Sequence, residues 1–374
     1  MIIFYHELTG MDEQIQTKIL NYVEQDDFDG ALEKVNEYLT SQKNDADAIA
    51  LKAMILLEMD RPEEALKEAN RAIKINNFHF YNFLAGSAML DLGLIDDAIR
   101  LLKKSSDESD DDPGYLTKLA SAFEMKGDMQ SALKAIIRAI KNDPDNVELI
   151  IIKASLLNAL NREREAISEL NKINDNEELK AEAYFVEAES HMNLKHIPTA
   201  EKSILKALEL TKDLPDQRYL ERASEIETAL NKPVQAIKFI EEAISINHSN
   251  ERYKLIKGSL LLDFKMHDEA KQFGFEQYRE NKNNPLLTFM FIDILSTTQD
   301  LKLFTTFLDE AGFPESLNTL IKIYYGLDDQ EDESATENAL SNLSSDVKGN
   351  QYMEDLSVIL YNNLVGDEED MDEE

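Results

Sequence analysis

The sequence predicts an all-α protein in which short helix pairs stack one upon another. The first observation behind this prediction is an alanine that recurs in steps of 33 to 36 residues, at Ala31, Ala65, Ala98, Ala132, Ala166, Ala200, Ala236 and Ala270. The second is a shortage of helix breakers, with 12 Gly and 8 Pro among 374 residues. A fixed period near 34 indicates stacked copies of one small unit, and the composition favours helices.

Each period reads as two antiparallel helices when the recurring alanine is counted as repeat position 20. Position 8 is small in seven of eight units and position 27 is mostly small, whereas position 11 is usually large. Helices approach closely only where the side chains at their crossing are small, so positions 8, 20 and 27 mark the helix contacts. The position 8 residues are Ile19, Ala53, Gly86, Ala120, Ala154, Ala188, Ser224 and Gly258.

Helix-breaking residues separate the two helices of each unit. Segments such as 58–64 (EMDRPEE) and 125–131 (MKGDMQS) carry the Gly, Asp and Pro that end one helix and begin the next. The second helix ends in polar turn residues, as in 141–146 (KNDPDN), where Pro144 stops the helix. Beyond Pro285 the period decays into apolar helical segments.

The unit that begins at Pro113 shows this pattern best, through Leu116, Leu119, Ala120, Phe123, Ala132, Ile136, Ala139 and Pro144. With these residues the sequence resembles the tetratricopeptide repeat (TPR) family, a helix-turn-helix unit with small residues at positions 8, 20 and 27. The resemblance covers roughly Met11 to Pro285. It departs from the family pattern in having no Trp, and a proline at position 32 in one unit alone. It implies a right-handed α-α superhelix, a TPR solenoid of about nine to ten helix-turn-helix repeats.

The expected organisation has four parts. Residues 1–11 form an N-terminal extension, 12–285 hold eight repeats, and 286–365 hold degenerate repeats and capping helices. Residues 366–374 (GDEEDMDEE) are an acidic tail with too few apolar residues to fold, so we expect it to be disordered. The sequence leaves open whether translation starts at Met1 or Met11.

The formal net charge is −35, from 74 acidic and 39 basic residues. Such a chain repels nucleic acid and anionic lipid and attracts basic partners, although the charge would also follow from an acidic proteome. There is no cysteine, which fits a reducing compartment, and no apolar run long enough to span a membrane. We therefore expect a cytoplasmic protein that binds neither nucleic acid nor membrane.

The resemblance implies that repeat positions 2, 5, 9, 12 and 13 line a concave groove. In the eight units these positions hold two bases, Arg218 and Arg252, and twelve acids: Glu13, Glu24, Asp47, Glu58, Asp91, Glu124, Glu148, Glu182, Glu189, Glu221, Glu225 and Asp263. Apolar groove positions gather in two groups. The predicted peptide-binding residues are Met54, Leu57, Glu58, Phe80, Phe83, Leu90, Asp91, Ile151, Phe185, Glu189 and Met192.

These features predict a non-catalytic scaffold that binds a basic or amphipathic segment of another protein in its groove. Desolvation around Phe80 and Phe83 is expected to drive binding. One alternative is a chaperone-like acidic shield for a basic, nucleic-acid-binding protein, and another is a recruitment subunit of a larger complex. No cofactor, metal or catalytic residue is predicted. Glu187, His191 and His196 are the closest approach to a metal site, but His191 stands at position 11, where large residues pack, so helix packing is the better interpretation. The sequence leaves the partner, the pathway and the oligomeric state open.

Overall fold

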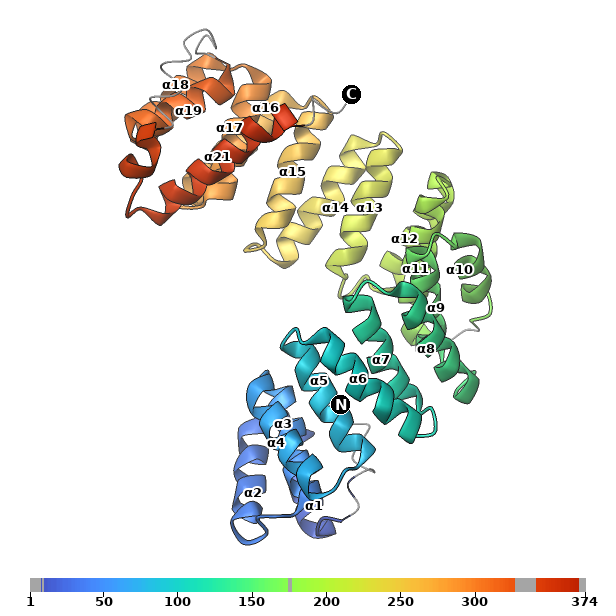
Figure 1. Ribbon diagram of the computed structural model, residues 1–374. Helices are drawn as coiled ribbons and strands as arrows, with labels where there is room; N and C mark the ends of the chain where they lie inside the picture. Colours follow the sequence, from blue (N-terminus) through green and yellow to red (C-terminus); the bar gives the residue numbers. More distant parts are fainter. Residues whose placement is uncertain (1–7, 9, 174–176, 327–340, 370–374) are drawn as a thin grey trace. The chain divides into compact units, whose positions relative to one another are not determined.

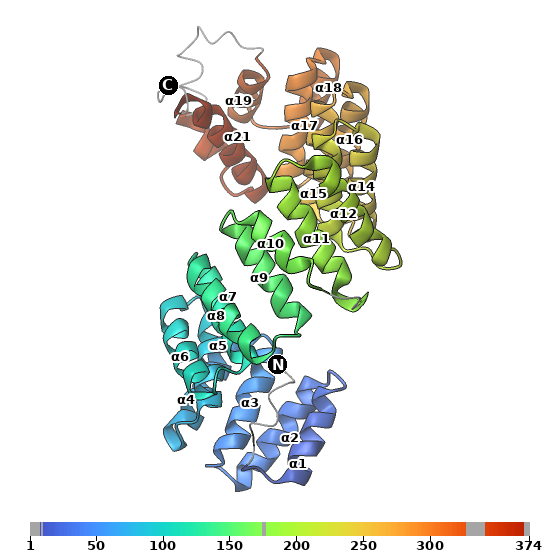
Figure 2. The same cartoon turned by 90° about the vertical axis from the view of Figure 1, so that its right-hand side faces the viewer.

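The computed structural model describes residues 8, 10–173, 177–326 and 341–369, and in these ranges the chain forms helices and no strand. It divides into two compact units, Met1–His196 and Ile197–Glu374, and the boundary falls between two helices. Within each unit consecutive helices run antiparallel and stack side by side (Figures 1 and 2). The predicted all-α fold of repeated helix pairs is confirmed.

The first unit contains eleven described helices, and two helices fall in each complete period of about 34 residues. They are α1 (Glu13–Val23), α2 (Phe28–Ser41), α3 (Ala46–Glu58), α4 (Pro62–Ile75), α5 (His79–Asp91), α6 (Ile95–Glu108), α7 (Pro113–Met125), α8 (Met129–Asn142), α9 (Val147–Ala159), α10 (Glu163–Leu170) and α11 (Glu177–Asn193). The odd-numbered helix of each pair is called the inner helix below, because it carries the positions predicted to line the groove.

The second unit continues the pattern and then departs from it. Its described helices are α12 (Ile197–Leu210), α13 (Gln217–Ala229), α14 (Pro233–Ile246), α15 (Glu251–Asp263), α16 (His267–Glu280), α17 (Pro285–Thr298), α18 (Leu301–Ala311), α19 (Glu315–Tyr325) and α21 (Gln351–Glu369). Residues 341–346 are also helical.

A left-handed residue at repeat position 15 reverses the chain between the two helices of a pair. Nine consecutive units share it, with φ between 53° and 80°, at Asp26, Asp60, Gly93, Gly127, Asn161, Lys195, Asn231, Lys265 and Gln299. In the first eight units the next residue donates its backbone N–H to the carbonyl five residues earlier, as Arg61 does to Leu56 at 2.9 Å. This 6→1 bond is the mark of a Schellman ending, so one turn geometry repeats along the chain.

Aspartate begins many of the helices. The side chains of seven aspartates accept hydrogen bonds from backbone N–H groups in the first turn of the helix that follows, at Asp12, Asp27, Asp45, Asp112, Asp128, Asp216 and Asp300. A carboxylate at this place satisfies orphan donors and complements the helix dipole. Part of the acidity of the chain therefore serves its own helices.

The core of each pair lies where small side chains meet. All eight alanines at position 20 are fully buried. A Cβ added at Gly86 would lie 2.8 Å from Leu102 Cγ and 3.4 Å from the Ala98 carbonyl oxygen, so α5 and α6 leave no room for a methyl group there. The predicted roles of positions 8 and 20 in close helix packing are thus confirmed.

The unusual Glu227 at position 11 of the seventh unit has a structural partner. This side chain is buried, and its carboxylate lies 3.2 Å from Lys232 Nζ, which also lies 2.6 Å from Glu201. A buried carboxylate needs such a cation because its desolvation is otherwise unfavourable. Glu227 thus forms an ion pair within its own repeat, and this pair replaces the large apolar side chain that is usual at position 11.

The C-terminal helix α21 packs against α17 and α19. Leu356 and Leu360 are fully buried, and the Tyr352 hydroxyl lies 3.0 Å from the Thr288 hydroxyl. Residues 366–374 were predicted to be a disordered tail, whereas in the structure α21 continues to Glu369. Its packed first turns nucleate a helix that glutamates extend readily. Residues 370–374 of the predicted tail lie outside the described residues.

None of the helices in the described part of the chain is long and apolar enough to cross a membrane.

Enlarging the small residue at position 20 should destabilise the fold. We expect Ala98→Leu to lower the free energy of unfolding by about 1–3 kcal/mol, because α5 and α6 have no space for the added atoms. Urea denaturation followed by circular dichroism measures the change. Ala159→Leu, at an exposed helix end, is the matched control and should change stability by less than about 0.5 kcal/mol. Equal effects of the two substitutions would contradict the assigned packing.

Candidate peptide-binding surface

The inner helices α7, α9 and α11 surround an open hollow of about 410 Å³ in the first unit. It is lined by Thr117, Ser121, Glu124, Glu148, Ile151, Ile152, Ser155, Leu179 and Glu182. Seven of these nine residues stand at repeat positions 2, 5, 9 or 12, which were predicted to line the groove, so the hollow lies on that face. Three consecutive repeats contribute to it.

The hollow combines apolar side chains with hydrogen-bond acceptors. Ile152 and Leu179, which are both partly exposed, supply apolar surface beside the buried Ile151, and three glutamates supply carboxylates. The Thr117 hydroxyl donates to the Pro113 carbonyl at 2.8 Å and the Ser121 hydroxyl donates to the Thr117 carbonyl at 3.2 Å. These hydroxyls use their hydrogens within α7 and present oxygen lone pairs outward. The nine lining residues include no Lys or Arg.

Burial raises the pKa of Glu124 above its ordinary value. Desolvation disfavours the charged carboxylate at this place, and a positive group brought close to it would oppose that effect. The electrostatics of the hollow therefore favour a cationic occupant over an anionic one.

A second hollow of about 350 Å³ lies between α13 and α15 in the second unit. It is lined by Glu221, Ser224, Glu225, Thr228, Arg252, Ile256 and Leu260. Here the acids have cationic neighbours in the chain, since Arg252 pairs with Glu221 and Arg222 lies 2.5 Å from Glu225. Glu221 raises the pKa of Arg252, as expected of an ion pair. Among its lining residues this hollow holds two acids and one base, whereas the lining of the first hollow holds three acids and no base.

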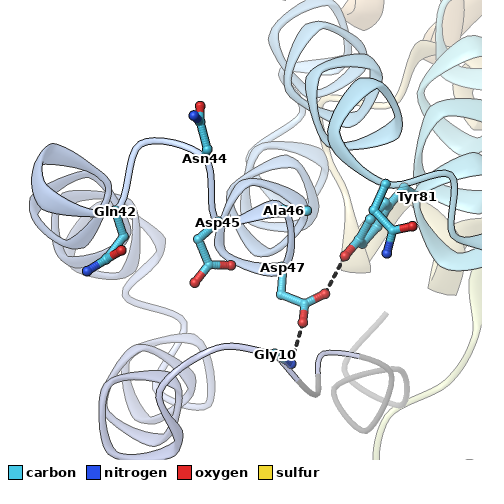
Figure 3. A pocket seen from close by; sticks show the side chains of 8 residues that line it. Gly10, Gln42, Asn44, Asp45, Ala46, Asp47 and Tyr81 are labelled. Carbon is cyan, nitrogen blue, oxygen red and sulfur yellow. Dashed lines mark hydrogen bonds between the residues drawn. The ribbon is translucent and has the colours of Figure 1, made fainter.

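A third, polar hollow lies at the N-terminal ends of α3 and α5 (Figure 3). Asp47 is its central side chain and is nine-tenths buried. Its carboxylate accepts hydrogen bonds from the Gly10 backbone N–H and from the Tyr81 hydroxyl. Asp45, which caps α3 just before it begins, accepts from the Tyr38 hydroxyl at 2.9 Å and from the Ala48 N–H at 3.0 Å.

Most of the predicted apolar groove residues are buried in the structure. At most 9% of the residue surface is exposed at Met54, Leu57, Phe80, Phe83, Leu90, Ile151 and Phe185. The expectation that Phe80 and Phe83 present an open apolar patch is therefore wrong. The Phe83 ring lies 4.7 Å from the Tyr115 ring of the next inner helix and 6.2 Å from Phe80, so these rings pack between repeats.

The remaining predicted residues are more accessible. Glu58 and Asp91 are exposed, whereas Glu189 and Met192 are half-buried. Of the predicted peptide-binding residues, Ile151 alone lines the α7–α9–α11 hollow. The other predicted residues do not line this hollow, and their binding role stays a prediction.

The histidine pair considered as a metal site packs within the chain. The His191 and His196 rings lie 5.9 Å apart, and burial lowers the pKa of His191. In the described ranges no group of three or more His, Asp or Glu side chains is arranged to hold a metal ion.

Residue-type reasoning missed the hydroxyl side chains of the hollow. Thr117, Ser121 and Ser155 stand at positions 5 and 9, where the sequence prediction named large apolar residues. Small hydroxyl residues at those positions, beside the acids at 124, 148 and 182, are the sequence feature that could have indicated the hollow. Small side chains leave the space that large ones fill with packing.

Two family models of the tetratricopeptide repeat match the chain, over residues 46–79 and 83–147. No curated protein matches the sequence. Among solved structures, the chain is similar to a tetratricopeptide repeat protein from Parabacteroides merdae, with 15% identity and a TM-score of 0.54 over 67% of this chain and 98% of that one. It is also similar to yeast Tom70, with 15% identity and a TM-score of 0.57 over 80% of this chain and 67% of that one.

Both likenesses in three dimensions are those of the fold. The two family models and the solved structures agree on one fold, a stack of tetratricopeptide helix pairs. The chain resembles the tetratricopeptide repeat family, and residues 46–79 and 83–147 carry its repeats.

Proposed function

We propose that this chain is a non-catalytic scaffold that binds a basic or amphipathic segment of another protein across its inner helices. Tetratricopeptide repeats generally mediate protein–protein interaction, and their fold is typically a non-catalytic scaffold. The observation that carries the proposal is the hollow between α7, α9 and α11, with its apolar side chains and three carboxylates. A helix or extended peptide with apolar residues and a Lys or Arg complements that surface.

The position of the hollow supports a segment rather than a small molecule as the occupant. The hollow is open, and consecutive inner helices contribute to it in turn, so a ligand can continue along the repeats. The apolar residues supply contact area, whereas the carboxylates steer and orient a basic partner. The second hollow, with its internal ion pairs, offers less attraction to a cation.

Neutralising the acids of the first hollow should weaken binding of a basic amphipathic peptide. The probe is a fluorescein-labelled helical peptide with leucine on one face and lysine on the other. We expect Glu124→Gln/Glu148→Gln/Glu182→Gln to raise its dissociation constant by about tenfold, or ~1.4 kcal/mol, in a fluorescence polarisation titration. A peptide with glutamate in place of lysine should not bind.

The matched control removes the same charge elsewhere. Glu33, Glu63 and Glu209 are exposed on second helices of their pairs, so Glu33→Gln/Glu63→Gln/Glu209→Gln should change the dissociation constant by less than about twofold. If both triple variants lose affinity equally, and binding disappears at moderate salt, the chain acts as a general polyanion. That result would favour the acidic-shield alternative over the groove.

The charged carboxylate of Glu124 in this hollow is expected to lower the stability of the fold. Burial raises the folded-state pKa of Glu124, so its charged form opposes folding above that pKa, and the effect vanishes below the unfolded pKa. We expect Glu124→Gln to raise the melting temperature by about 1–3 °C at pH 7 and to leave it unchanged near pH 4. Differential scanning calorimetry at the two pH values measures this.

Glu169 is the matched control, with the opposite sign. Burial alone would raise its pKa, but hydrogen bonds from Lys172 and Lys153 lower it. Its carboxylate therefore stabilises the fold above its unfolded pKa, and this stability is lost as the pH falls through the folded pKa. Glu169→Gln should lower stability at pH 7 by about 1 kcal/mol. A loss of stability in both variants would contradict the electrostatic account of the hollow.

A further inference from the structure

The second helices of three consecutive repeats carry an exposed row of basic side chains. The second helix of each pair is called the outer helix here, and its repeat positions 22, 25 and 29 share one face because they are spaced i, i+3 and i+7. In α4, α6 and α8 these nine residues are all exposed. They form the outer ridge, with six bases and one acid: Lys67, Asn70, Lys74, Arg100, Lys103, Asp107, Lys134, Ile137 and Lys141.

The basic character of the outer ridge is local. In the other five of the eight repeats the same positions hold three bases and four acids, namely Lys202, Lys238, Arg279, Glu33, Asp175, Glu209 and Glu241. The chain as a whole has about twice as many acids as bases. The excess of bases on α4, α6 and α8 is therefore not a general property of the outer helices.

Contacts between repeats join the three helices of the outer ridge. Arg138 of α8 lies 2.9 Å from Asp107 of α6, and the Lys104 ammonium of α6 donates to the Asn77 side chain, just after α4, at 3.1 Å. These contacts hold consecutive outer helices next to each other. The bases of the ridge therefore lie on one continuous surface of the first unit.

Most of these bases are not neutralised by the chain. Within the described ranges, five of the six have no ion pair: Lys67, Lys74, Lys103, Lys134 and Lys141. The sixth, Arg100, lies 2.7 Å from Asp97 in the preceding turn of α6. The acid of the ridge, Asp107, is paired with Arg138. The outer ridge thus has an excess of positive charge on a chain whose net charge is −35.

An open hollow of about 480 Å³ lies at the α4 end of the outer ridge. It is lined by Asn44, Lys67, Glu68, Arg71, Lys74 and Ile75. The acid among them, Glu68, is matched by two bases, because its carboxylate lies 3.1 Å from Lys52 and 3.2 Å from Arg71. The unpaired ammonium groups of Lys67 and Lys74 remain for a ligand, and Ile75 is 44% exposed. The hollow therefore offers positive charge beside apolar surface.

Acidic residues border the outer ridge and limit the ligand that it fits. Glu63 and Glu64 are exposed in the first turn of α4, and Asp96 and Asp97 are exposed in the first turn of α6. A nucleic acid duplex or an anionic membrane would extend over these acids, within the screening length of about 8 Å, and be repelled. A short segment of polypeptide can remain on the ridge. Charge complementarity thus favours an acidic peptide.

We propose that the outer ridge and its hollow at α4 bind an acidic segment of a partner protein. The Asp and Glu carboxylates of that segment contact Lys67 and Lys74, and an apolar side chain of the segment covers Ile75. This surface lies on other helices than the α7–α9–α11 hollow and selects the opposite charge. It goes beyond the proposed function, and either can fail without the other.

A fluorescence polarisation titration of the full chain tests this surface. The probe is a short fluorescein-labelled peptide in which Glu or Asp alternates with Leu, in about 0.15 M salt. We expect saturable binding, and we expect Lys67→Gln/Lys74→Gln to raise the dissociation constant by at least about fivefold. The same peptide with Gln and Asn in place of its acids should not bind.

The matched control is Lys202→Gln/Lys238→Gln. Both lysines are exposed at position 22 of their outer helices, and the two double variants have the same net charge. The control should change the dissociation constant of the acidic peptide by less than about twofold. The basic peptide that probes the α7–α9–α11 hollow should bind Lys67→Gln/Lys74→Gln within about twofold of the natural chain. Circular dichroism reports whether each variant is folded.

Three results would overturn the proposal. The first is that the acidic peptide does not bind saturably, or that both double variants weaken it equally. The second is that single-stranded DNA of equal charge binds more tightly than the peptide and loses affinity in Lys67→Gln/Lys74→Gln, since the ridge would then select nucleic acid. The third is self-association in sedimentation velocity that the same variant abolishes, since a second copy of the chain would then cover the ridge.

Discussion

The close approach of two helices at repeat positions 8 and 20 is the constraint on which the rest of this structure depends. Alanine at position 20 is fully buried in all eight repeats, and Gly86 faces Leu102 with no space for a methyl group. Because the contact fixes how the two helices of a pair face each other, it also fixes which side of the inner helix remains for ligands. Binding surface and core are thus set by the same few small residues.

Sequence periodicity was enough to predict the helix pairs, since helix contacts restrict residue size. It did not reveal the left-handed turn at position 15, because Asp, Gly, Asn, Lys and Gln all occupy it and share no composition. It also misjudged the groove. The position of Phe83 in the repeat was correct, but its burial depends on Tyr115 in the next repeat, and one repeat alone does not contain that information. The acids at 124 and 148 were predicted at groove positions, and the structure adds the hydroxyl side chains between them.

The acidity of the chain has several separate structural uses. Seven aspartates cap helices, and Glu227 forms a buried ion pair with Lys232. Glu221 in the second hollow is matched by Arg252, whereas the nine lining residues of the first hollow include no base. A net charge of −35 therefore does not describe one uniform surface. What each carboxylate contributes to the stability of the fold therefore depends on its own neighbours.

The left-handed turns have a consequence for how stability is distributed along the chain. Seven of the nine turns have a residue other than glycine at the left-handed position. The left-handed conformation costs such a residue roughly 1 kcal/mol relative to glycine. Because the stability of stacked repeats is approximately a sum over units, each turn changes its own repeat and hardly any other. Glycine substitution at single turns could therefore set the order in which repeats unfold under force or heat, while every inner-face side chain is kept.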